Sequence, residues 1–117
     1  MIAAIIPIIG GVLSIVLGLV GLFRPLVITI PSGIQAMNEL GKMELRAIFG
    51  AVFLVLGFTS ILFRQPEIYL VAGLVFIGAA GTKAVSLFID RPPVKLAVPG
   101  ILFDLFVGLA LASGYFF

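Results

Sequence analysis

Two charged residues in long hydrophobic stretches, Lys83 and Asp104, are the best candidates for chemistry in this chain. A lone charge at the centre of a membrane-spanning helix costs about 2.5–3.5 kcal/mol, so such residues usually pair or serve a function. Lys83 lies seven residues before Asp90, and Asp104 lies nine residues after Lys95. At 1.5 Å per residue these depths are about 10 Å and about 13–14 Å. The similar depths predict that the two side chains converge.

Three interpretations of this pair stay open. It forms a site for an anionic or protonatable ligand or a proton or ion pathway, or it is a buried latch that sets helix register. Alternatively, Lys83 only extends its ammonium group to the headgroups. Arg46 is a competing partner for Asp104 and is expected within reach of the same carboxylate. The predicted intramembrane polar cluster comprises Glu44, Arg46, Lys83, Ser86, Asp90 and Asp104.

The composition excludes many other kinds of site. The chain has no Cys and no His, which excludes disulfides, thiol catalysis, iron–sulfur clusters and the usual haem and zinc sites. It has no phosphate-cradling glycine loop and no nucleophile placed beside a base. A net charge of +2 is too small for nucleic-acid binding. We therefore expect a protein that is not an enzyme and needs no metal or cofactor, with membrane lipid as its bound component.

The elements that position these residues follow from hydrophobicity. Of the 117 residues, 62% are hydrophobic and 10% are charged, with a mean hydropathy of +1.38, whereas soluble domains are about 45–50% apolar and about 25% charged. Hydrophobic stretches cover about 2–23, 47–63, 68–89 and 96–117, close to the roughly 20 residues that span a bilayer. The first is expected to be a helix, not a signal peptide. The prediction is an all-α membrane protein with four transmembrane helices in an up-down bundle, one domain over 1–117.

The first connector, residues 24–43, is longer than the other two. Ile34, Met37 and Leu40 recur there at helical spacing among polar residues, which predicts a short amphipathic helix in the membrane interface. An ordered loop is the alternative.

The distribution of basic residues predicts the orientation of the chain. Only Arg64 and the terminal amine lie on the side of the chain ends. The opposite side carries Arg24, Lys42, Arg46, Arg91 and Lys95. Since cytoplasmic loops carry the excess of Lys and Arg, we expect both termini outside a bacterial inner membrane. An inverted or dual topology is the alternative.

Small residues predict where the helices meet, because helices in lipid associate through close packing. The predicted packing positions are Gly11, Gly18, Gly50, Gly57, Gly100 and Gly108. Gly78 and Gly81 are expected to face a second protein.

Two motifs resemble a known family. Residues 44–50 read Glu-Leu-Arg-Ala-Ile-Phe-Gly, and Lys83, Ser86 and Asp90 precede a Pro-Pro pair. With four spans in 117 residues, this pattern resembles the uncharacterised DUF4345 family of small four-helix bacterial membrane proteins. That family more often has Arg where Lys83 stands and Glu where Asp104 stands, which keeps both charges. The resemblance implies a four-helix membrane protein of unknown activity and groups Glu44, Arg46, Lys83, Asp90 and Asp104 into one site.

Three functions are compatible with these features. The first hypothesis is a non-enzymatic accessory or scaffold subunit that packs against a larger membrane complex or against itself. The second is a small ion-coupled transporter or exporter that uses the Lys83–Asp104 pair. The third is a lipid or quinone binder with phenylalanine-lined grooves. The expected partners are membrane lipids and other membrane protein subunits or further copies, and no nucleic acid.

Overall fold

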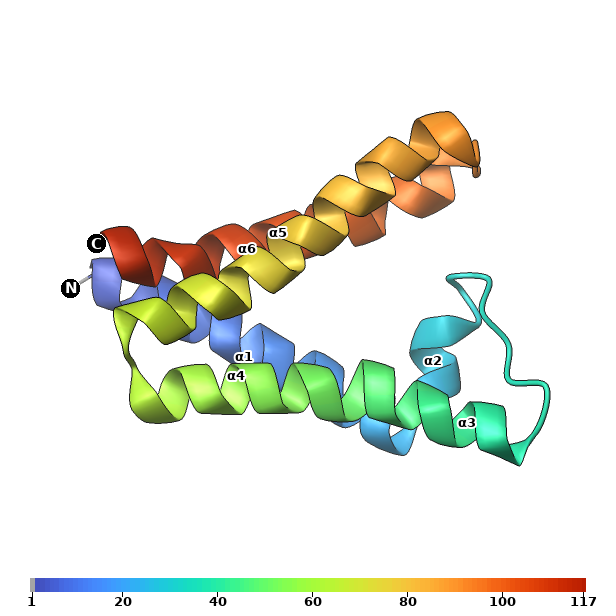
Figure 1. Cartoon of the computed structure of the whole chain (residues 1–117), viewed down its shortest axis with the longest axis horizontal. Coiled ribbons are helices and arrows are strands. Elements are labelled where there is room, and N and C mark those ends of the chain that lie inside the picture. Colours follow the sequence, from blue (N-terminus) through green and yellow to red (C-terminus); the bar gives the residue numbers. More distant parts are fainter. Residues whose placement is uncertain (1) are drawn as a thin grey trace.

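The computed structural model describes residues 2–117, and four of its helices are long and apolar enough to cross a membrane (Figure 1). None of the described residues forms a strand, and the predicted all-α four-helix fold is confirmed. The four spans are α1 (Ile2–Phe23), the continuous segment Glu39–Phe63, α5 (Pro66–Ile89) and α6 (Val94–Phe116), and a short helix α2 (Pro25–Thr29) follows α1.

The second span is built from three consecutive segments. They are α3 (Glu39–Arg46), a π-helical turn η1 (Ala47–Ala51) and α4 (Val52–Phe63). The side chain of Asn38 accepts a hydrogen bond from the backbone N–H of Gly41 at 2.8 Å, which satisfies one free donor of the first turn. The helix therefore begins eight residues before residue 47, the predicted start of this span. Hydropathy missed the first eight residues because they include four charged side chains.

The connector between α1 and α3 also differs from the expectation. The predicted amphipathic helix is wrong at Ile34 and Met37, since residues 34–38 are irregular and Met37 is 95% exposed, whereas Leu40 lies in α3, which begins within the predicted connector 24–43. The other helical part is α2, which begins with Pro25, a residue already preset for the first helical position. The chain reverses after α2 at Gly33, whose φ of 83° lies in the left-handed region that favours glycine.

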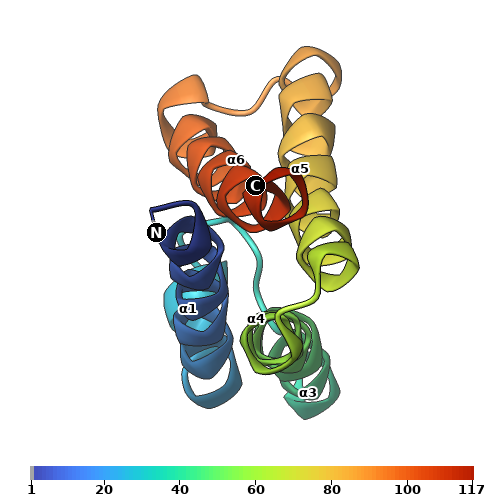
Figure 2. The ribbon, with the colours of Figure 1, turned by 90° about the vertical axis from the view of Figure 1, so that its left-hand side faces the viewer.

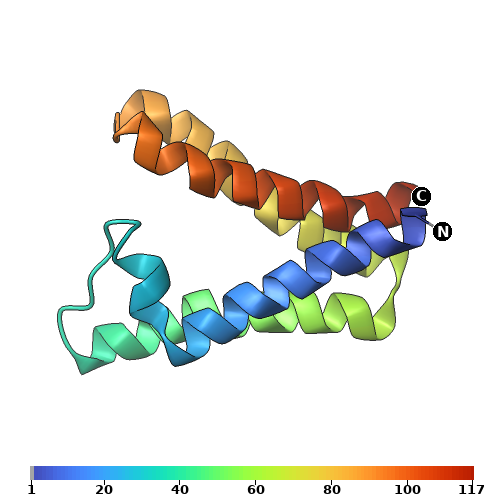
Figure 3. The same ribbon diagram turned by 180° about the vertical axis from the view of Figure 1, so that it is seen from behind.

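The spans run up and down and form two hairpins. Both chain ends and the α4–α5 connector lie at one end, and the α2 region and the α5–α6 connector lie at the other (Figure 1). Helix α4 lies against α1, α5 lies against α6, and α1 also packs on α6 (Figure 2). Away from the chain ends the two hairpins diverge, so the molecule is V-shaped (Figure 3). We call the end with the termini the closed end and the other the open end.

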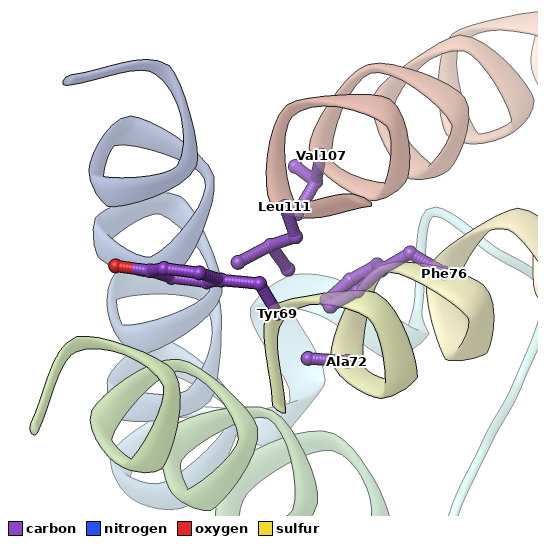
Figure 4. Packing of buried hydrophobic residues seen from close by; sticks show 5 residues of the cluster. All are labelled: Tyr69, Ala72, Phe76, Val107 and Leu111. Carbon is purple, nitrogen blue, oxygen red and sulfur yellow. The ribbon is translucent and has the colours of Figure 1, made fainter. Parts of the chain in front are cut away.

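The hydrophobic core joins the two hairpins. Its fully packed members come from α5 and α6 and are Tyr69, Ala72, Phe76, Val107 and Leu111 (Figure 4). Partly buried residues of α1 and α4 pack against them, among them Phe53, whose ring centroid lies 5.3 Å from that of Phe76. This core therefore fixes the α5–α6 hairpin to α1 and α4.

Candidate functional site

Lys83 on α5 and Asp104 on α6 form the predicted ion pair. The Lys83 Nζ atom donates a hydrogen bond to the Asp104 Oδ2 atom at 2.6 Å. The two partners differ in burial, since the Lys83 side chain is 50% exposed and that of Asp104 only 9%. The carboxylate is thus enclosed between helices, while the ammonium group also faces outward. Both residues lie one to two turns from the core residues Phe76 and Val107, on the side of the open end.

Arg46 does not reach this carboxylate. Its Nη1 atom donates a hydrogen bond to the backbone carbonyl of Leu22, in the last turn of α1. Carbonyl groups in the last turn of a helix lack an intrahelical partner, and a nearby cation also interacts favourably with the helix dipole. The expectation that Arg46 shares Asp104 is therefore wrong, and Arg46 instead caps α1 from the neighbouring helix.

The remaining members of the predicted cluster lie apart from the pair. Glu44 is exposed on α3, and among the described residues it makes no ion pair. Ser86 donates a hydrogen bond from its hydroxyl group to the carboxylate of Asp90, one turn further along α5. Two of the six residues pair across spans, Lys83 with Asp104, and two pair within one helix end, Ser86 with Asp90. Among the described contacts, Glu44 and Arg46 touch no other member of the predicted cluster.

A hollow of about 360 Å³ lies beside Lys83. The first connector contributes Pro31, Ser32 and Gly33, and α5 contributes Lys83 and Ser86. The wall is completed by the α5–α6 connector and the first two turns of α6, through Pro92, Pro93, Leu96, Ala97 and Gly100. Asp104 does not line it. Lys83 is therefore the charged side chain that faces this hollow, and the carboxylate lies behind its ammonium group.

The predicted glycines of the first two spans lie where expected. Gly11 and Gly18 on α1 face α4, and Gly50 and Gly57 face α1. A Cβ atom on Gly50 would lie 2.7 Å from the Leu22 Cα atom, and one on Gly18 would lie 2.7 Å from the Leu54 Cα atom. Such distances require the backbones to separate. Close approach of the two helices therefore depends on these glycines.

In the α5–α6 hairpin one predicted glycine packs between helices and one does not. Gly108 faces the backbone of α5, and a Cβ atom on it would lie only 2.8 Å from the Ile77 backbone nitrogen. Gly100 lies beside Lys83, whose Nζ atom would be 3.5 Å from a Cβ atom at position 100, so this glycine borders the hollow. The sequence prediction missed Gly73, which faces the α6 backbone opposite Gly108. Gly73 and the small residue Ala80 are two helical turns apart and lie on the same face of α5. This spacing of small residues could have identified Gly73 as a packing position from the sequence.

One face of α5 has no neighbour within the chain. Cβ atoms added to Gly78 and Gly81 would meet no heavy atom within 4 Å. These glycines form a shallow surface with the polar residues Thr82 and Ser86 and with Val85. We call this surface, together with Ile89 and Asp90, the α5 outward face. It differs from the bulky apolar surfaces that the other spans present, such as Leu102, Phe106 and Leu109 on α6.

Comparisons with protein-family models, curated proteins and solved structures found no match to the chain. The resemblance to the DUF4345 family therefore stays a prediction. Within residues 2–117, no three acidic side chains come together in a way that could hold a metal ion. Four membrane-length apolar helices make the chain a small integral membrane protein.

Proposed function

We propose that the chain is a non-enzymatic accessory or scaffold subunit that packs through the α5 outward face against another membrane helix, of a larger complex or of a second copy. The observation that supports this is the position of Gly78 and Gly81. In this chain Gly18, Gly50, Gly57, Gly73 and Gly108 each face the backbone of a neighbouring helix, whereas Gly78 and Gly81 face none.

Helices in lipid meet where small residues let the backbones approach, and Ser and Thr hydroxyl groups add hydrogen bonds across such contacts. The α5 outward face combines both features, with Gly78 and Gly81 beside Thr82. Lipid chains gain little from a surface of this kind, because its grooves are shallow and the hydroxyl group of Thr82 finds no partner in hydrocarbon. A second helix would fill the grooves and supply backbone carbonyls as acceptors.

The experiment compares assembly of the wild type with that of Gly81→Leu, extracted from native membranes into polymer nanodiscs. The new side chain meets nothing within the chain, so folding should be retained. We expect the wild type to elute as an assembly larger than its 12.3 kDa mass, and the variant to lose its partner at unchanged thermal stability. Ala51→Leu adds bulk at another exposed position and should leave assembly intact. A wild type that is monomeric and free of co-purifying protein would contradict the proposal.

We further propose that the protein resides in a bacterial inner membrane with both termini outside. Three of the basic residues that support this orientation, Arg24, Arg91 and Lys95, lie on connectors or helix ends at the open end. The positive-inside rule then puts the open end, with the Lys83 hollow, on the cytoplasmic side.

A further inference from the structure

We propose that the hollow beside Lys83 binds the phosphate group of an anionic membrane lipid. The hollow lies at the open end, between the Pro31–Gly33 turn and the tip of the α5–α6 hairpin. Its volume of about 360 Å³ is in the range of small-molecule sites, about 300–1,000 Å³. Mostly apolar walls with two serines, Ser32 and Ser86, and one charged group are suited to an amphiphile, whose headgroup meets the polar groups and whose chain continues into the bilayer.

Lys83 can serve both Asp104 and a ligand. A lysine ammonium group carries three N–H donors, and within residues 2–117 Lys83 donates one hydrogen bond, to Asp104. Two donors remain for a phosphate oxygen, and the side chain is half exposed toward the hollow. The buried carboxylate holds the ammonium group in place and lies outside the lining of the hollow. A bound anion would therefore approach Lys83 from the side opposite Asp104.

The electrostatic surroundings favour an anion. The open half carries six basic residues, Arg24, Lys42, Arg46, Lys83, Arg91 and Lys95, and four acidic residues, Glu39, Glu44, Asp90 and Asp104. The excess of two equals the net charge of the whole chain, +2, because Arg64 and Glu67 cancel at the closed end. The first turn of α6 also borders the hollow, and the N-terminal end of a helix carries partial positive charge. Basic pockets between spans on the cytoplasmic side are typical of lipid headgroup sites.

The depth of Lys83 fits a lipid better than a solute from the cytoplasm. It lies seven residues inside Asp90, which corresponds to about 10 Å along the helix axis. Gly100 has no side chain and so leaves space next to the ammonium group. A Cβ atom at position 100 would lie 3.5 Å from the Nζ atom of Lys83. A larger side chain at position 100 would occupy the hollow without removing either partner of the ion pair. This gives a variant that closes the site and keeps the charges.

The experiment measures lipid retention by native mass spectrometry of the full chain, released from detergent micelles that contain phosphatidylglycerol and phosphatidylcholine in equal amounts. We expect the wild type to retain phosphatidylglycerol with a preference of at least about fivefold, the effect of one lysine near an anionic headgroup. Gly100→Leu should abolish the preference. Leu102→Phe, which adds bulk to an exposed position of the same helix, should retain it.

A second variant tests the charge separately from the space. The double variant Lys83→Met/Asp104→Leu removes the ammonium group without leaving a lone buried carboxylate, and it should also lose the preference while remaining helical. Equal retention of the two lipids by the wild type, or an unchanged preference in Gly100→Leu, would overturn the proposal. Inorganic phosphate provides the last comparison. If it displaces phosphatidylglycerol at millimolar concentration, the site is one for free phosphate and the lipid assignment is wrong.

Discussion

Removing Lys83 should destabilise the protein more than removing Asp104, because the two partners differ in burial. In Lys83→Met the carboxylate of Asp104 remains enclosed, with 9% of its side chain exposed, and loses its only cationic partner among the described residues. In Asp104→Leu the ammonium group of Lys83 is already half exposed and can turn to water or to lipid headgroups. If both partners of the ion pair were equally buried, the two substitutions would lower the free energy of unfolding by equal amounts.

The magnitudes follow from the distance and the exposure. At an effective dielectric constant of about 20, two unit charges 2.6 Å apart attract each other by about 6 kcal/mol. Dehydration of both groups offsets most of this attraction, so we expect a coupling free energy of about 1–3 kcal/mol. Lys83→Met should lower the free energy of unfolding by about 3–5 kcal/mol, the usual cost of an unpaired buried charge. Asp104→Leu should lower it by about 1 kcal/mol, and the double variant should lose less than the sum of the two.

The free energy of unfolding can be measured by titrating micelles of neutral detergent with dodecyl sulfate and following the helical circular dichroism signal. Lys95→Met is the matched control, since this exposed lysine makes no ion pair among the described residues, and it should change stability by less than about 0.5 kcal/mol. Asp104→Asn checks whether the larger leucine adds strain. A loss for Asp104→Leu as large as that for Lys83→Met, or a coupling near zero, would refute the reasoning from burial.

Three other predictions concern packing, capping and orientation. Gly18→Leu should destabilise the protein by about 3 kcal/mol or more, because the new side chain overlaps the α4 backbone, whereas Leu19→Ala at an exposed position should cost less than about 1 kcal/mol; equal melting temperatures would contradict the packing. Arg46→Met should cost about 1–3 kcal/mol and speed hydrogen exchange in the last turn of α1, since it leaves a carbonyl group unpaired; unchanged exchange there would contradict the cap. A cysteine at Ser32 or Arg91 should be shielded from an impermeant reagent on intact cells, and one appended to the C-terminus should react, whereas the reverse pattern would contradict the orientation.

Depth and residue type were sufficient to predict the ion pair, but not the partner of Arg46. Lys83 and Asp104 lie at similar distances from the same end of their spans, so the pairing followed from the helical rise alone. Arg46 was an equally good candidate partner for Asp104, because depth in the membrane does not identify the neighbouring helix that a helix face contacts. Its spacing of four from Gly50 held the missing information. Gly50 packs on α1 at Leu22. Arg46 is on the same helix face as Gly50, so it lies beside the last turn of α1 and not beside α6.

The boundaries of the second span show a different limit. Hydropathy identifies where a helix is apolar enough for hydrocarbon, and residues 47–63 of this span contain no charged residue. The helix itself extends into polar sequence, where the capping side chain of Asn38 sets its start. The apolar residues Ile34, Met37 and Leu40 at helical spacing instead favoured an amphipathic helix that begins before Asn38. The exposed Met37 shows that this spacing had no surface to pack against within the chain.

The V shape follows from the way the glycines are distributed among the helix faces. Along α1 the small residues Gly11, Gly18 and Gly21 all face the second span, so these two helices stay close over their full length. The approach of α1 to α6 depends on Gly10, which faces Ala110 and Leu111 near the closed end.

Toward the open end, no glycine of the described chain brings α4 or α1 against α5 or α6. The gap between the tips of the two hairpins widens toward the open end (Figures 1 and 3). Lys83 lies on this widening side, which explains why it is half exposed although it is seven residues inside its span. A glycine-mediated contact between the second span and α5 at that level would instead have buried the ammonium group together with Asp104.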